Sequence, residues 1–242
     1  WQVDRAVAGG GSWPAIAWAI IPGAALFVSP KLRARLAWPV GAHPETYLGI
    51  AGCGIAVALI VWSLFTNFTM RGDPHPLPYV PLLNPLDLAQ AFVLLVLIRY
   101  WLHVHREQYR ILSIVSLEGA AATLAALAFI WLNAVLLRTL HHWAGVPFEL
   151  EAMVTSTLVQ TSLSIFWTLL ALATMVFATR GASRIVWLAG AVLLAVVVVK
   201  LFVVDLSRVG TVERIVSFVV VGLLMLVVGY FSPLPPAREE RA

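Results

Sequence analysis

The chain has 242 residues, of which 61% are hydrophobic and only 12% are charged, and its formal charge is +4. Soluble domains carry about 25% charged residues, so this composition excludes a soluble fold and a disordered chain. The single cysteine excludes a disulfide scaffold. Together with a mean hydropathy of +0.90, these values predict an all-α, polytopic transmembrane helical bundle.

A helix needs about 20 mostly apolar residues to cross a bilayer. About seven segments meet this requirement, near residues 13–29, 46–66, 85–105, 114–140, 154–178, 184–206 and 212–231. We expect them to form one transmembrane bundle over residues 1–231, followed by a flexible tail over 232–242. Pro22 and Gly23 interrupt the first segment, which predicts a kinked span, a broken span or a re-entrant segment.

A proline-rich connector over residues 67–85 separates the second and third predicted spans. Its prolines predict an extended and fairly stiff conformation. It ends in Asn84-Pro85-Leu86-Asp87, where an N-cap residue, a proline at the first helical position and an acid in the first turn indicate a helix start.

The distribution of basic residues predicts the orientation of the spans. Of the 16 Lys and Arg residues, ten fall on one side of the predicted spans and six on the other. Cytoplasmic loops carry the excess of Lys and Arg. We therefore expect the N-terminus outside and the C-terminus in the cytoplasm.

Polar residues gather toward the outer ends of spans three to seven. Polar groups in hydrocarbon are expensive and usually face a cavity or a partner, so we predict an outward-facing polar pocket between these spans. Arg138, His141, Lys200 and Arg214 would hold an anionic phosphate or carboxylate, and the polar groups Asp87, Gln90, Asn133 and Gln160 would orient it. Asp205 would poise Lys200, and His141 or His142 could act as an acid or base only where a substrate reaches it. The candidates are Arg138, His141, His142, Lys200, Asp205, Arg214, Gln160, Asn133, Asp87 and Gln90.

Structural interpretations of the same residues stay open. The stripe of Thr157, Gln160, Thr161, Ser164 and Thr168 could equally make interhelical hydrogen bonds, worth about 0.6 kcal/mol each on average. Lys200 could snorkel to the membrane interface or pair with Asp205. The Arg138–His142 segment could be a structural cluster at the membrane interface, and its adjacent histidines point to different helix faces. No catalytic, nucleotide-binding or haem motif is present, so we expect no cofactor, no metal and no nucleic acid partner.

The cytoplasmic end of the third span carries Arg99, His103, His105 and Arg106. This spacing is typical of a positive-inside anchor that lies close to anionic lipid.

Several motifs stand out along the chain: Leu77-Pro-Tyr-Val-Pro-Leu-Leu-Asn-Pro-Leu-Asp-Leu-Ala-Gln90, His141-His-Trp-Ala-Gly-Val-Pro-Phe148, Lys200-Leu-Phe-Val-Val-Asp205-Leu, Arg214-Ile-Val-Ser-Phe218, Gly222 and Gly229-Tyr230. Together they resemble the C-terminal part of a bacterial family of predicted membrane proteins, domain-of-unknown-function family 2339. The resemblance runs from about Leu77 onward and is most specific at Lys200–Gly229. It implies a bacterial inner (cytoplasmic) membrane location and a fragment of a longer chain, and it supplies no activity and no catalytic residue.

Three functions are consistent with these features. The first is the handling of an anionic envelope lipid or glycan in the polar pocket, which leaves open whether the protein is an enzyme. The second is transport, which would need access from both sides of the membrane. The third is a non-catalytic structural subunit of a membrane complex. Expected partners are membrane lipids, an anionic lipid or glycan, and other spans of a longer chain or partner membrane subunits.

Overall fold

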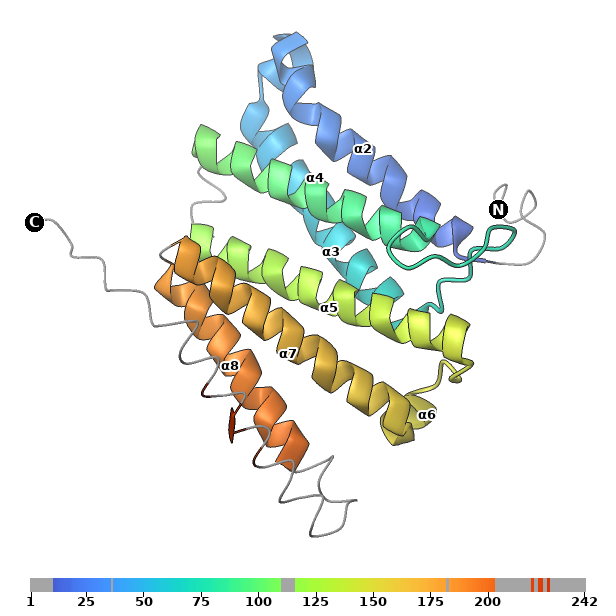
Figure 1. Ribbon diagram of the computed structural model, residues 1–242. Helices are drawn as coiled ribbons and strands as arrows, with labels where there is room; N and C mark the ends of the chain where they lie inside the picture. The colour runs from blue at the N-terminus through green and yellow to red at the C-terminus, as the bar shows by residue number, and fades with distance from the viewer. Residues whose placement is uncertain are drawn as a thin grey trace, which may run out of the picture. The chain divides into compact units, whose positions relative to one another are not determined.

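The computed structural model describes residues 11–35, 37–109, 116–181 and 183–202, together with positions 219, 222, 223 and 226. Every regular element in these ranges is a helix, which confirms the all-α prediction. The chain divides into two compact units, Trp1–Phe148 and Glu149–Ala242. Figure 1 shows the helices of each unit. The single bundle over residues 1–231 stays a prediction, and each unit is described by itself.

Five helical segments of the described chain are long and apolar enough to cross a membrane, and they correspond to the first five predicted spans. The sixth predicted span, 184–206, contains a helix of 17 residues. Most of the seventh lies outside the described residues, so the count of seven remains a prediction. The five segments are Trp13–Lys31, Glu45–Thr69, Pro85–Glu107, Leu117–Ala144 and Thr157–Arg180.

The first unit is built around helix α4, which packs against α2, α3 and α5. Half of the most apolar stretch of α4 is buried, so this helix forms the centre of the unit (Figure 1). A short π-helical segment, η2, runs directly into α3. The elements are α2 (Trp13–Arg35), η1 (Ala37–Gly41), η2 (Glu45–Ala51), α3 (Gly52–Thr69), α4 (Pro85–Glu107) and α5 (Leu117–Ala144).

Helix α2 continues through Pro22, so the first segment is not broken there, and the alternatives of a kinked span and of a re-entrant segment stay predictions. A proline removes one backbone hydrogen bond, and neighbouring helices can compensate for this within a membrane bundle. The next residue, Gly23, lets α2 approach α4 closely, since a Cβ atom there would lie 2.7 Å from Cε1 of Phe92. Packing against α4 therefore holds α2 in one helix.

Helix α4 begins as its sequence predicts. The Oδ1 atom of Asn84 accepts a hydrogen bond from the Leu86 backbone N–H at 3.1 Å, and Pro85 occupies the first helical position. The N-cap prediction is confirmed. This start fixes the position of Asp87 in the first turn.

The second unit contains α6 (Leu150–Thr155), α7 (Thr157–Arg180) and α8 (Arg184–Lys200). The predicted start of the fifth span, residue 154, lies in α6 instead. A break at Ser156 separates α6 from α7, and the Ser156 hydroxyl caps the Val159 N–H at 3.4 Å. Helices α7 and α8 lie side by side (Figure 1). A Cβ atom on Gly190 of α8 would lie 2.7 Å from Cγ of Met175.

Candidate functional site

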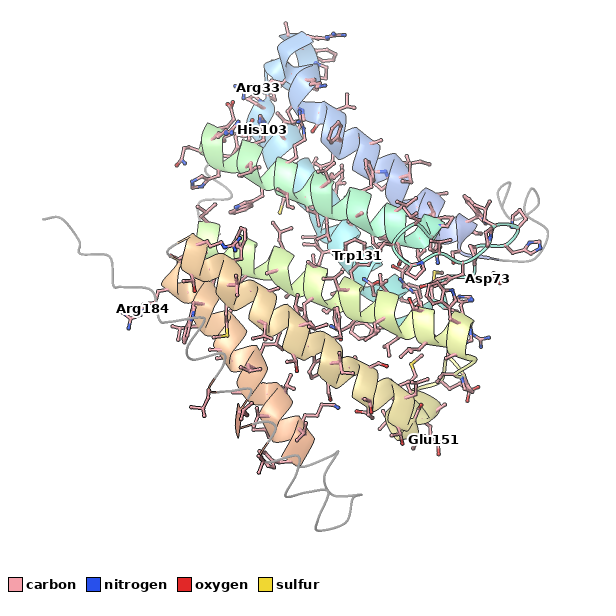
Figure 2. All side chains as sticks on the ribbon, in the orientation of Figure 1. Arg33, Asp73, His103, Trp131, Glu151 and Arg184 are labelled. Carbon is pink, nitrogen blue, oxygen red and sulfur yellow. The ribbon has the colours of Figure 1, made fainter. Side chains whose placement is uncertain are left out.

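The buried polar residues of the first unit concentrate where α3 ends, α4 begins and α5 ends. We call this the connector end, because residues 70–84, the part of the predicted 67–85 connector that lies outside the helices, join α3 to α4 there. From here on the connector means residues 70–84. Successive helices run in opposite directions, so these three termini meet although they are far apart in sequence. Asp73 lies at this end, and Arg33 and His103 lie at the opposite end (Figure 2).

A buried ion pair forms the centre of the connector end. Nη1 of Arg138 on α5 donates to Oδ1 of Asp87 on α4 at 2.8 Å, and both side chains are 0% exposed. A charge in an apolar interior survives only when it is paired and well hydrogen-bonded. The surroundings of the guanidinium meet that condition.

Arg138 also donates to three groups at the end of α3. Its Nε donates to the Met70 carbonyl at 3.1 Å, and its Nη2 donates to the Thr66 carbonyl at 3.0 Å and to Oδ1 of Asn67 at 3.3 Å. A guanidinium carries five N–H donors, so protein acceptors occupy most of its hydrogen-bonding capacity. One side chain thus joins α5 to α3, to α4 and to the start of the connector.

A second polar layer lies next to the ion pair. Oε1 of Gln90 accepts from the Ser63 hydroxyl at 2.6 Å, and Nε2 of Gln90 donates to Oγ1 of Thr66 at 2.7 Å. All three side chains are buried. Thr66 therefore links the two layers, since its hydroxyl contacts Gln90 and its carbonyl contacts Arg138.

Three buried polar atoms beside this network lack a hydrogen bond: Oδ2 of Asp87, Nδ2 of Asn67 and Nε1 of Trp131. The indole of Trp131, labelled in Figure 2, interacts with the Asp87 carboxylate without reaching hydrogen-bond geometry. Orphaned polar atoms in a dry interior are expensive. The pair is therefore sensitive to small changes around it.

The connector is attached to the helices at its start. The amide of Asn84 donates from Nδ2 to the Gly72 carbonyl at 2.6 Å. Gly72 has φ of 71°, and a Cβ atom there would lie 2.9 Å from Cδ of Arg138. Only glycine suits a site with a left-handed backbone and such a close neighbour.

The rest of the connector is held by aromatic side chains. The Tyr79 ring stacks on His142 with centroids 4.2 Å apart, and its hydroxyl lies 3.3 Å from Oγ1 of Thr139. His142 contacts the Arg71 carbonyl through Nε2 at 3.1 Å. A carbonyl only accepts, so this nitrogen carries a hydrogen. Trp13 donates from Nε1 to the His75 carbonyl at 2.9 Å.

Other candidate residues of α5 contact backbone carbonyls nearby. His141 donates from Nδ1 to the Val146 carbonyl at 2.7 Å, beyond the C-terminus of α5. Asn133 donates from Nδ2 to the Phe129 carbonyl of its own helix at 2.8 Å. These hydrogen bonds stabilise the backbone of α5 and of the turn that follows it. They do not place the side chains of His141 and Asn133 against the Arg138–Asp87 ion pair.

In the second unit, Lys200 on α8 meets the polar stripe of α7. Its Nζ donates to the Ser164 hydroxyl at 2.7 Å and to the Gln160 carbonyl at 3.0 Å. The hydroxyl of Thr168 bonds back to the Ser164 carbonyl at 2.7 Å. Part of the predicted stripe thus joins the two helices, as its structural interpretation expects.

The structure brings together Arg138, Asp87 and Gln90 in the first unit, and Lys200 with Gln160 in the second. Asp205 and Arg214 lie outside the described residues. One pocket shared by all these residues would join both units, and it stays a prediction. A recess of about 200 Å³ opens at the connector beside Ser12, Arg71 and Asp73, and none of the candidates lines it.

Sequence reasoning missed the partners that α3 supplies. Ser63, Thr66 and Asn67 lie at positions i, i+3 and i+4, on one face of the helix. Such a polar face at the end of an apolar span indicates that these residues hydrogen-bond to a neighbouring helix. Among the residues in described positions, no group of three His, Cys, Asp or Glu side chains could hold a metal ion.

The opposite end of the first unit holds a second ion pair. Nη1 of Arg33 at the end of α2 bonds to Oε2 of Glu107 at the end of α4, and it also donates to the Tyr109 hydroxyl at 3.2 Å. The two charged side chains are 33% and 37% exposed. Burial raises the pKa of the Tyr109 phenol, so this hydroxyl stays protonated beside the pair.

A family model described as "Predicted membrane protein (DUF2339)" matches residues 1–235. The match begins well before Leu77, where the resemblance of the motifs starts. Neither a curated protein nor a solved structure matches the chain.

Proposed function

Since this chain belongs to the DUF2339 family of predicted membrane proteins, we propose that it is a non-catalytic membrane module that presents a rigid apolar surface to a membrane partner. One observation carries the proposal. The most elaborate polar network of the described residues holds the chain together and leaves its central cation 0% exposed. A cation that received an anionic ligand would need an open approach.

The network supports a specific part of the chain. It ties the end of α3, the start of α4 and the end of α5 into one block, and Asn84 and Tyr79 attach the connector to that block. A loop held in this way loses little conformational entropy when it binds a partner. Rigidity of the connector therefore favours recognition by a protein.

The connector displays apolar side chains. Leu77, Val80, Leu82 and Leu83 are all exposed, and Leu83 is 66% exposed. Exposed apolar patches on an ordered surface typically mark an interaction site with protein or membrane. We take the partner to be a second membrane subunit or further spans of a longer chain.

We further propose that the chain lies in the bacterial inner membrane with seven spans and with the connector on the outer side. The charges of the first unit support this orientation. Arg33, Arg99 and Arg106 lie at the end opposite the connector. At the connector end Arg71 is exposed and Arg138 is buried and paired, so accessible arginines are more numerous at the opposite end. Exposed basic residues near span ends are the ones that face the cytoplasm.

The test separates a structural role of the ion pair from a chemical one. A double variant, Arg138→Met with Asp87→Leu, replaces the pair by apolar side chains of similar size. A second double variant, Leu77→Ser with Leu83→Ser, alters only the connector surface. Its matched control is Leu150→Ser with Val154→Ser, which changes two exposed apolar residues of α6. Each variant is returned to cells that lack the gene.

We expect the ion-pair variant to accumulate in membranes and to restore the phenotype of the deletion strain. We expect the connector variant to accumulate and fail, while the α6 control succeeds. The proposal is wrong if the ion-pair variant accumulates with a normal melting temperature yet fails, because the charges would then act chemically. It is also wrong if the connector variant restores the phenotype fully.

The handling of an anionic envelope lipid or glycan is the second candidate, and it depends on Lys200. Its ammonium group is placed against the polar stripe of α7, 2.7 Å from the Ser164 hydroxyl. A cation inside a transmembrane pair is often functional. A Lys200→Met variant that accumulates and fails in the same cells would favour this candidate, and one that restores the phenotype would exclude it.

A further inference from the structure

A groove between α2 and α4 lies at the end of the first unit that is opposite the connector. It has a volume of about 520 Å³. Phe27 and Pro30 of α2 form one wall, and Leu95 and Leu102 of α4 form the apolar part of the other. His103, labelled in Figure 2, also lines the groove and marks its position near the end of α4.

The α4 wall follows one face of the helix. Leu95, Arg99, Leu102 and Arg106 are spaced at i, i+4, i+7 and i+11, which places them in one row. At about 1.5 Å per residue, this row is about 16 Å long. The groove is therefore apolar at the end nearer the middle of the helix and cationic toward the helix terminus.

Neither Arg99 nor Arg106 forms a salt bridge with a carboxylate among the residues that the structure describes. Glu107, the acid at the end of α4, bonds to Arg33. The Arg99 guanidinium instead lies over the Phe27 ring, 4.6 Å from its centroid. Arg99 and Arg106 are exposed, so their charges are accessible at the groove.

We propose that this groove binds one anionic phospholipid of the adjacent leaflet. Arg99 and Arg106 contact the headgroup phosphate, and an acyl chain lies over Phe27, Leu95 and Leu102. A phospholipid has the same order of groups, a charged head followed by an apolar chain. The proposal concerns a different end of the molecule from the connector and does not depend on the proposed function.

The length of the groove distinguishes a lipid from a free anion. Inorganic phosphate would occupy only the cationic end and would gain nothing from the apolar wall. Arginine side chains near an anionic surface each contribute enough to change affinity several-fold. Two arginines combined with an apolar groove would therefore favour an anionic lipid over both a neutral lipid and a free phosphate ion.

The experiment uses the full chain, purified in detergent and titrated with phosphatidylglycerol or phosphatidylcholine in mixed micelles. Native mass spectrometry then reports the bound lipid. We expect preferential binding of phosphatidylglycerol. An Arg99→Gln, Arg106→Gln variant should bind it about thirty-fold more weakly. The matched control, Arg180→Gln with Arg184→Gln, removes two exposed arginines elsewhere and should change the affinity less than threefold.

A second variant tests the apolar wall without altering charge. Leu102 is 46% exposed, so Leu102→Trp should fold and fill the groove, and it should weaken phosphatidylglycerol binding at least fivefold. Inorganic phosphate alone should not raise the melting temperature of the wild type. The proposal is overturned if both double arginine variants lose affinity equally, if neither does, or if phosphate stabilises as well as the lipid.

Discussion

The two ends of the first unit each hold an arginine–carboxylate pair between helices, and the two pairs differ in their surroundings. Arg138 and Asp87 are both 0% exposed, whereas Arg33 and Glu107 are about one-third exposed. The same type of ion pair therefore lies in a low-dielectric interior at one end and close to water at the other end. The degree of burial, more than the contact itself, determines how strongly the loss of one partner changes the free energy of unfolding.

The neighbours of each pair reflect this difference. Arg138 requires three further acceptors from the end of α3, since water cannot satisfy its donors. Arg33 has one further partner, the Tyr109 hydroxyl. Breaking the buried pair leaves an isolated charge in the interior, while breaking the exposed pair leaves two solvated side chains.

The largest effect is expected for Arg138→Met alone. It leaves the Asp87 carboxylate buried without its partner, which typically costs about 3–5 kcal/mol. Adding Asp87→Leu should restore most of that loss. The measurement is the free energy of unfolding in detergent micelles. If the single and double variants are equally unstable, the pair does not act as a unit.

A smaller effect is expected for Gly72→Ala. The left-handed backbone of Gly72 and the nearby Cδ of Arg138 should together lower stability by about 2–3 kcal/mol. Gly145→Ala is the matched control, because Gly145 has φ of 69° and open space around its Cβ position. It should lose only about 1 kcal/mol. Equal losses would mean that the contact with Arg138 contributes nothing.

Breaking the exposed Arg33–Glu107 pair should lower the free energy of unfolding by less than breaking the buried pair. Arg33→Gln should lower the free energy of unfolding by at most about 1 kcal/mol, because solvent screens the pair. The difference from the wild type should shrink further as salt is raised. Glu107→Gln should behave in the same way. A loss that matches that of Arg138→Met would contradict the role assigned to burial.

The smallest expected effect is that of Tyr79 on the stability of the protein at alkaline pH. Burial raises the pKa of the Tyr79 phenol above its ordinary value near 10. The folded state thus favours the protonated phenol, and the resulting stability is present below pH 10 and lost as pH rises through the raised pKa. Tyr79→Phe should flatten the loss of stability above pH 10. Identical pH profiles for the variant and the wild type would contradict this.

The sequence predicted those parts of the fold that depend on local pattern. The five spans follow from runs of apolar residues, and the start of α4 follows from Asn84 and Pro85. Of the alternatives predicted at Pro22, the broken span is wrong, because packing of α2 on α4 outweighs the missing hydrogen bond. The break at Ser156 was missed, since no proline or glycine marks it.

The candidate site was predicted only in part. Arg138, Asp87 and Gln90 were identified as costly polar residues of the outer half of the membrane, but their pairing depends on the relative register of α3, α4 and α5. A single sequence does not contain that register. The stacking of Tyr79 on His142 was missed for the same reason, because the two residues belong to segments far apart in the chain.

One amide group at the start of α4 makes two hydrogen bonds with different structural roles. The oxygen of Asn84 begins the helix, and its nitrogen secures the loop through the Gly72 carbonyl. Aspartate would initiate the helix equally well, yet its carboxylate only accepts hydrogen bonds and offers no donor in place of the amide nitrogen. The attachment of the loop therefore selects asparagine at position 84. A homologue with aspartate there should use a different hydrogen bond to hold the corresponding loop.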